Sequence, residues 1–306
     1  MVEPRTASVR ALPTPRRWDR TVPKKERNEN EPKPKPPKPK LFYPNPGDVG
    51  DLGRWSPAID ECFAVEYAHT HGAEERRQAR ARVGDVRLHA ERQDVGSDAW
   101  KQMLDLVEEA ADDGRPVFWP GKDLAPEVLA QIIELPPTIS KLTEVTHLRL
   151  YGSYLVRFPP EIGEMRSLVE LDAYRSYRLH WFPFEITRCP ALRDSRISTR
   201  ALYGNMMIRG AFPNLDDEDA KSWSTGSCSV CGTPLGERIA LLGWISLWVG
   251  TDVLPLLVRA CSEGCLERVP VPPNGYVSRP HRGGTSLVQP MTYFEFHGKM
   301  RERSPS

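Results

Sequence analysis

Two stretches decide the fold of this chain: residues 135–155, LPPTISKLTEVTHLRLYGSYL, and residues 158–179, FPPEIGEMRSLVELDAYRSYRL. Each stretch begins with a large apolar residue and two prolines, and a third copy begins at Phe182, so the copies are spaced by 23 and then 24 residues. A fixed period of this length is the signature of a repeat architecture, in which each copy stacks on the next. Five further columns match in all three copies: Ile139, Ile162 and Ile186; Leu142, Met165 and Cys189; Val145, Leu168 and Leu192; Leu148, Leu171 and Ser195; Leu150, Ala173 and Ile197.

The copies resemble the leucine-rich repeat, in the variety that reads LPxxIxxLxxLxxLxLxxNxL. The resemblance covers about residues 135–203, which is less than a quarter of the chain. It implies that the LxL portion of each copy is a short parallel strand and that the LPxxI portion returns along the convex side. It also implies that a protein partner binds on the concave side.

One departure from the family concerns the asparagine whose side chain bonds neighbouring turns. Ser153, Ser176 and Arg200 stand at that position, so we expect packing and backbone hydrogen bonds alone to hold the turns together. In the third copy Ser195 replaces a core leucine, which we expect to weaken the core there, and no fourth copy follows. Both ends of so short a stack expose apolar surface and strand edges, so both need caps.

The cap on the N-terminal side is predicted to come from residues 98–134. Ser97 or Asp98 can start a helix whose apolar residues recur at helical spacing, and Gly114 can end it. Residues 117–119, Val-Phe-Trp, predict a short strand, and a second helical stretch is expected to open at Pro126.

The strand portions also predict an exposed face. Side chains alternate along a strand, so the residues between the buried leucines face the concave surface. Tyrosine and arginine are enriched where interfaces concentrate binding energy. The alternative is a self-satisfied surface, in which opposite charges on adjacent strands contribute about 0.2 to 1 kcal/mol per pair and bind nothing. We predict that the partner-binding residues are Arg149, Tyr151, Asp172, Tyr174 and Arg196.

Four of the six cysteines form two pairs, Cys228 with Cys231 and Cys261 with Cys265, separated by 29 residues. Four thiolates brought together form the closed tetrahedral site that a structural zinc prefers. The segment CSVCGTPL resembles a zinc-ribbon knuckle, in which Gly232 lets the backbone turn under the metal. The second pair departs from the usual two-residue gap by having three. Reduced structural thiols and redox or disulfide chemistry are the alternatives.

Between the two cysteine pairs, residues 239–258 imitate a membrane span, with Asp252 as the only charge. A turn signal at residues 250–252, an interrupting proline and many β-forming residues favour a buried hairpin instead. Its large apolar residues are too many for two strands to bury. We therefore expect the hairpin to cover the third copy, with Trp244 or Trp248 buried against residues 192–212.

The N-terminal segment differs in composition from the rest of the chain. Residues 1–40 hold 12 of the 42 Lys and Arg, 5 of the 41 acids and 9 of the 30 prolines. Such a segment is predicted to be disordered, and the remainder is acidic overall, which argues against a wholly basic nucleic-acid-binding domain. Basic residues at the start are not followed by the apolar stretch of a secretory signal, so we expect a cytoplasmic protein without disulfides.

No motif of a known catalytic centre was found. A phosphate loop, a GxSxG elbow, HExxH and a dinucleotide fingerprint are all missing from the sequence. Cys62 and Cys189 lie in apolar stretches and are predicted to be packing residues rather than nucleophiles. His69 and His71 lack a third metal ligand in view. The chain is therefore not expected to be an enzyme.

The predicted fold class is α/β, a short repeat solenoid with a helical N-terminal cap, a small zinc-bound β unit and a disordered tail. The expected domains are the basic Pro-rich tail at 1–45, the helical region at 46–134, the repeats at 135–212 and the zinc-ribbon-like unit at 213–306. The predicted function is protein binding by a scaffold with a structural zinc and no membrane association. The alternative is a nucleic-acid-binding protein that uses the ribbon and the tail.

Overall fold

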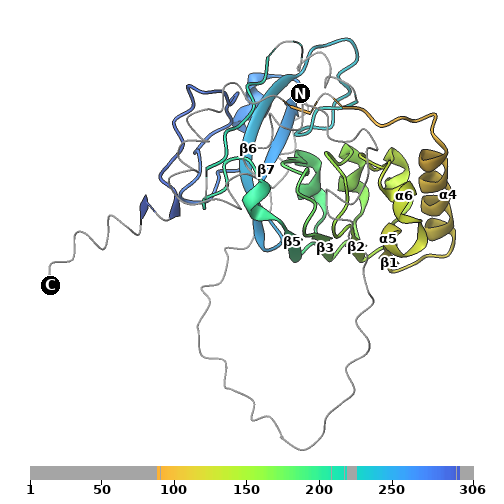
Figure 1. The fold of residues 1–306 in the computed structure, drawn as a ribbon. Coiled ribbons are helices and arrows are strands. Elements are labelled where there is room, and N and C mark those ends of the chain that lie inside the picture. Colours follow the sequence, from red (N-terminus) through yellow and green to blue (C-terminus); the bar gives the residue numbers. More distant parts are fainter. Residues whose placement is uncertain are drawn as a thin grey trace, which may run out of the picture. The chain divides into compact units, whose positions relative to one another are not determined.

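The computed structural model describes residues 88–89, 91–207, 209–216, 218, 226–293 and 295–296. They form a mixed α/β fold with two sheets and short helices (Figure 1). The predicted tail, Cys62, His69 and His71 lie outside the described residues. The elements are α4 (Asp98–Asp112), β1 (Val117–Phe118), α5 (Pro120–Asp123), α6 (Pro126–Leu129), η1 (Pro137–Lys141), β2 (His147–Arg149), η2 (Pro160–Glu164), β3 (Glu170–Ala173), β4 (Phe182–Pro183), η3 (Phe184–Arg188), β5 (Asp194–Ile197), η4 (Thr199–Ala201), β6 (Leu241–Val249), β7 (Asp252–Ala260) and α8 (Glu263–Glu267).

The three sequence copies stack on one another in register. The first sheet has the order β1-β2-β3-β5, and all its strands are parallel. His147 pairs with Glu170, and Glu170 pairs with Asp194, so the strand register equals the 23- and 24-residue spacing of the copies. Each copy also contributes a 3₁₀ helix, and η1 packs on η2 and η2 on η3. The matched apolar residues fill the space between the row of strands and the row of 3₁₀ helices. Among them, Leu148 and Ile162 are fully buried.

The N-terminal cap forms largely as predicted. The Ser97 side chain accepts a hydrogen bond from Trp100 N at the start of α4, which confirms the predicted cap. Helix α4 packs on η1, and β1 adds a strand beside β2. The helix after Pro126 is only the four residues of α6, and the chain then runs irregularly into the first copy.

Serine hydroxyls join neighbouring turns of the stack. The buried Ser176 donates from Oγ to Leu150 O over 2.9 Å and lies 2.8 Å from Ser153 Oγ. One turn later, Arg175 N donates to Ser198 Oγ over 2.7 Å. The expectation that packing and backbone hydrogen bonds alone hold the turns is therefore wrong. A hydroxyl can donate and accept at once, which lets a small buried serine link two turns.

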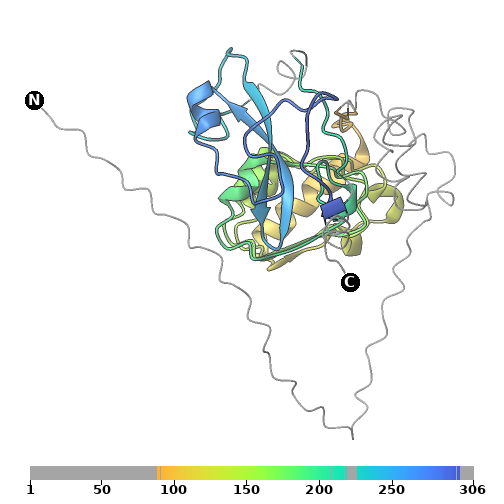
Figure 2. The ribbon, with the colours of Figure 1, turned by 90° about the vertical axis from the view of Figure 1, so that its left-hand side faces the viewer.

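The predicted hairpin is confirmed as β6 and β7, joined by Gly250 and Thr251. Its sheet has the order β4-β7-β6, so a strand of the third copy pairs with the hairpin. Figure 2 shows the hairpin in front of the stacked turns, covering their end. Trp244 is fully buried, with ring centroids 5.8 Å from both Tyr203 and Phe212, which confirms that the hairpin covers this end. None of the helices in the described part of the chain is both long and apolar enough to cross a membrane.

We expected Ser195 to weaken the core of the third copy, but it does not. It is 5% exposed, and its Oγ donates to Val249 O over 2.9 Å. Thr251 N donates to the same Oγ over 3.2 Å, and Thr251 Oγ1 donates to Ser195 O over 2.8 Å. A Cβ added at Gly250, where φ is +60°, would lie only 3.0 Å from Ser195 N. The serine therefore replaces a leucine because the hairpin turn docks there.

Two buried histidines, His89 and His180, and the half-buried His281 lie beside or against the third copy. The rings of His89 and His180 stack with centroids 5.5 Å apart, and His281 packs edge-on against Phe212 at 4.6 Å. Burial lowers the pKa of His89 to about 2 and the pKa values of His180 and His281 to about 4. All three are therefore neutral in the folded protein at neutral pH.

This burial makes the fold sensitive to acid. Because the folded pKa lies below that of an unfolded histidine, stability is fully present above about pH 6.5 and falls as the pH drops toward 4. For His180 alone the loss reaches about 3 kcal/mol. Urea unfolding of His180→Phe between pH 7 and 4 should show a shallower loss than the natural protein. Equal slopes for the two proteins would contradict this assignment.

Candidate metal centre and exposed strand face

The first cysteine pair, Cys228 and Cys231, lies on a tight turn. Gly232 N donates to Cys228 O over 2.9 Å, and Cys228 N donates to Thr233 O over 2.9 Å. Gly232 has φ +75°, a left-handed conformation that glycine adopts without strain. This turn places the buried Cys228 and the exposed Cys231 on one side of the backbone.

The second pair spans the step from β7 into α8. Cys261 directly follows β7, and Cys265 lies in the first turn of α8. The Ser262 side chain caps that helix by accepting from Cys265 N. One helical turn thus explains the three-residue gap that departs from the usual knuckle.

The four sulfurs converge as predicted. All four ligand atoms lie within 4.8 Å of one another, and Cys261 Sγ is 3.6 Å from both Cys231 Sγ and Cys265 Sγ. Tetrahedral bonds of about 2.3 Å would put sulfur atoms about 3.8 Å apart, so the spacing fits one metal ion. The quartet can therefore hold a metal, with all four ligands supplied by this chain.

Neighbouring donors favour the thiolate form of Cys231 and Cys265, whereas hydrogen bonds to the neighbouring thiols raise the pKa of Cys261 to about 12. Thr233 Oγ1 lies 3.2 Å from Cys231 Sγ, and its hydrogen bond lowers the pKa of Cys231 to about 6. Arg268 Nη2 donates to Cys265 Sγ over 2.9 Å and lowers the pKa of Cys265. Cys261 N also donates to Cys228 Sγ over 3.4 Å. Four thiolates on a divalent ion carry a net charge of −2, and Arg268 offsets part of it. The sequence analysis did not predict Thr233 and Arg268 as residues of this site. The only sequence signal for them is that each lies within three residues of a cysteine.

Within the described part of the chain, no further thiol or imidazole joins this site. Cys189 is buried in the third copy, where burial raises the pKa of its thiol to about 12, as expected for a packing residue. His281 Nδ1 accepts from Gly283 N over 3.2 Å and is not among the four ligands that converge. His297 lies outside the described residues.

The buried positions predicted along the strands are confirmed, whereas two of the five residues predicted to be accessible, Tyr151 and Asp172, are only half-buried. Leu148, Leu150, Leu171 and Ile197 are all at most 6% exposed. Tyr174 is 43% exposed and the Arg196 side chain 65%, whereas Asp172 is only 16% exposed. We call the five residues Arg149, Tyr151, Asp172, Tyr174 and Arg196 the strand face.

Members of the strand face also contact one another. Arg196 Nη1 lies 3.5 Å from Asp172 Oδ2, and the rings of Tyr151 and Tyr174 lie 5.9 Å apart. The Arg149 guanidinium lies 5.0 Å from the ring centroid of Trp119, a contact not foreseen from the sequence. These contacts hold the side chains in place and leave Tyr174 and Arg196 open to a partner.

No model of a known protein family matches this chain, and no curated protein sequence matches it either. The chemistry and geometry of the residues described above therefore carry the functional assignment.

Proposed function

We propose that this protein is a non-enzymatic interaction protein. A short leucine-rich repeat stack binds a protein partner through the strand face, and a zinc ion held by the four cysteines, in a ribbon-like unit, stabilises the hairpin on the end of the stack. The observation that carries the metal part is the convergence of four sulfurs within 4.8 Å. A closed all-thiolate set suits a structural zinc and leaves no open position for a substrate.

The repeat and partner parts of the proposal draw support from different observations. Parallel strands in register with the sequence period support the stack. Exposed tyrosine and arginine side chains over the sheet support a binding face, because these residue types are enriched where interfaces concentrate binding energy. The internal pair between Arg196 and Asp172 preorganises the guanidinium rather than removing it from solvent.

Replacing Tyr174 with alanine tests the partner proposal. Proteins that co-purify with the full chain are compared with those that co-purify with Tyr174→Ala and with Tyr177→Ala, a similarly exposed tyrosine outside the strand face. The affinity of the partner found this way should fall by more than about 1 kcal/mol for Tyr174→Ala and stay unchanged for Tyr177→Ala.

The nucleic-acid alternative makes a different prediction in the same assay. A DNA duplex or single strand bound through the basic tail would dissociate steeply as salt rises and would bind Tyr174→Ala normally. That pattern, with no partner sensitive to Tyr174, would overturn the proposed function.

A further inference from the structure

A cavity of about 520 Å³ lies against the 3₁₀ helices and the hairpin, and its wall at Gly226 and Ser227 adjoins the first cysteine pair. Its size is within the range of pockets that hold small ligands. Residues of η2, η3, β7 and the loops before the 3₁₀ helices line it. The apolar part of the wall consists of Phe158, Pro159, Pro160, Trp181, Pro183 and Leu257.

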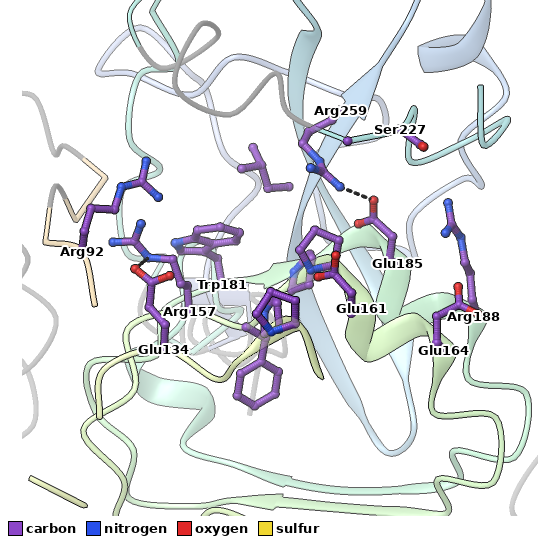
Figure 3. Close-up of a pocket in the computed structure, with 17 residues that line it drawn as sticks. Arg92, Glu134, Arg157, Glu161, Glu164, Trp181, Glu185, Arg188, Ser227 and Arg259 are labelled. Carbon is purple, nitrogen blue, oxygen red and sulfur yellow. Dashed lines mark hydrogen bonds and ion pairs between the residues drawn. The ribbon is translucent and has the colours of Figure 1, made fainter. Parts of the chain in front are cut away.

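Charged side chains lie on two opposite sides of this cavity. Figure 3 shows Arg92, Arg157 and Glu134 on one side and Trp181 in the middle. The other side holds Glu161, Glu185, Arg259 and Arg188. On the first side Arg157 Nε lies 3.5 Å from Glu134 Oε1, and Arg92 adds a second guanidinium. Arg157 Nη2 also donates to His89 O over 2.8 Å.

Glu185, on the second side, has an unused acceptor. Its side chain is 3% exposed, and its Oε1 accepts from Arg259 Nη2 over 2.6 Å and from Ser229 Oγ over 2.9 Å. Its Oε2 is buried and has no hydrogen-bond partner in the part of the chain that the structure describes. A buried carboxylate oxygen without a donor is costly, so this atom calls for a donor in the cavity.

Glu161 supplies a second carboxylate beside it. It occupies the same place in the second copy that Glu185 occupies in the third, 24 residues later. Among the described residues it makes no ion pair, whereas the neighbouring Glu164 pairs with Arg166 at 3.4 Å. Arg188, at the edge of this group, donates to Ser229 O over 2.8 Å. The lining as a whole holds four arginines and four glutamates. Glu134, Glu164 and Glu185 each pair with an arginine in the described part of the chain, which leaves Glu161 as the lining carboxylate without such a pair.

We propose that this cavity binds a cationic group carried on an apolar stem. An ammonium or guanidinium group donates to Glu185 Oε2 and to the Glu161 carboxylate, and its stem lies against Trp181 and the proline rings. Charge-assisted hydrogen bonds to a buried carboxylate are among the strong ones, and an indole face attracts a cation. The cation comes from a free amine or from a lysine or arginine side chain of a peptide.

Calorimetric titration of the full chain tests this site with two cationic probes. Agmatine represents the free amines, and an amidated tripeptide with a central lysine represents peptides. The same tripeptide with norleucine in place of lysine keeps the stem and removes the charge. We expect at least one cationic probe to bind and the norleucine peptide to bind at least about tenfold more weakly. The probe that binds identifies the source of the cation.

Two variants locate the binding. Glu161→Gln should weaken the cationic probe about tenfold, and Glu185→Gln at least as much. Glu170→Gln, an equal loss of charge at an exposed strand position, should bind like the natural protein. Circular dichroism checks that each variant is folded, and the partly exposed Glu161 keeps the test valid if Glu185→Gln unfolds. No binding of either cationic probe at millimolar concentration, equal binding of the norleucine peptide, or unchanged binding by Glu161→Gln would overturn the proposal.

Discussion

Cys231→Ala should abolish metal binding and unfold residues 228–265 before the sheet β1-β2-β3-β5 melts. Cys231 is the exposed member of the quartet, so its loss removes a ligand and little packing. Structural zinc contributes its binding free energy to folding, so a unit built around the ion loses its structure with the ion. Metal analysis should find about one zinc per natural chain and none in the variant. Hydrogen exchange should show protection lost in β6, β7 and α8.

The matched control for this change is Cys189→Ala, which removes a buried thiol outside the quartet. It should retain one zinc and lose stability only through the cavity it leaves. A strong chelator should reproduce the effect of Cys231→Ala on the natural protein. Visible absorbance would reveal iron in place of the colourless zinc ion. Full protection of the hairpin after chelation would show that packing alone holds it.

Trp244→Ala should destabilise the whole folded unit by about 3 to 5 kcal/mol. The indole is fully buried where the hairpin meets the third copy. It contacts Trp181, Tyr203 and Phe212, and its Nε1 donates to Pro213 O over 2.9 Å. Removing it opens a cavity and leaves that carbonyl without its donor. Urea unfolding followed by circular dichroism measures the loss.

The same strand provides the control. Trp248 is 60% exposed, four residues along β6 from Trp244. Trp248→Ala should change stability by no more than about 0.5 kcal/mol, as most exposed substitutions do. Comparable losses in the two variants would mean that the hairpin packs differently on the stack. Deleting residues 228–306 should expose the same surface, and the remaining fragment should aggregate.

Much of the stack follows from local regularities of the sequence. The 23- and 24-residue spacing predicts the strand register because copies of one sequence adopt one local structure and then stack. The strand period of two predicts that Leu148 and Leu171 are buried while Arg149 is exposed. The cysteine quartet was also predictable, because two close pairs on either side of a hairpin return to the same place.

Other features could not be predicted because the contacting residues are far apart in the chain. Ser195 looked like a defect until the hairpin turn, 54 or more residues later, supplied its partners. The serine links between turns depend on Ser176 being buried beside Leu150. Because the family's asparagine is missing at this position, the sequence pattern did not predict a side-chain link there. Local pattern alone therefore misjudged both positions.

The sequence by itself determined the repeat, its buried columns, the exposed strand face and the grouping of the four cysteines. The tertiary structure decided how the hairpin caps the stack, through pairing of β4 with β7 and burial of Trp244. It also created the cavity beside Glu185, whose Oε2 has no hydrogen-bond partner among the described residues. The physical reason is that periodicity and spacing record which side of an element faces the core. The partner of a buried polar atom is set only when separate elements pack together.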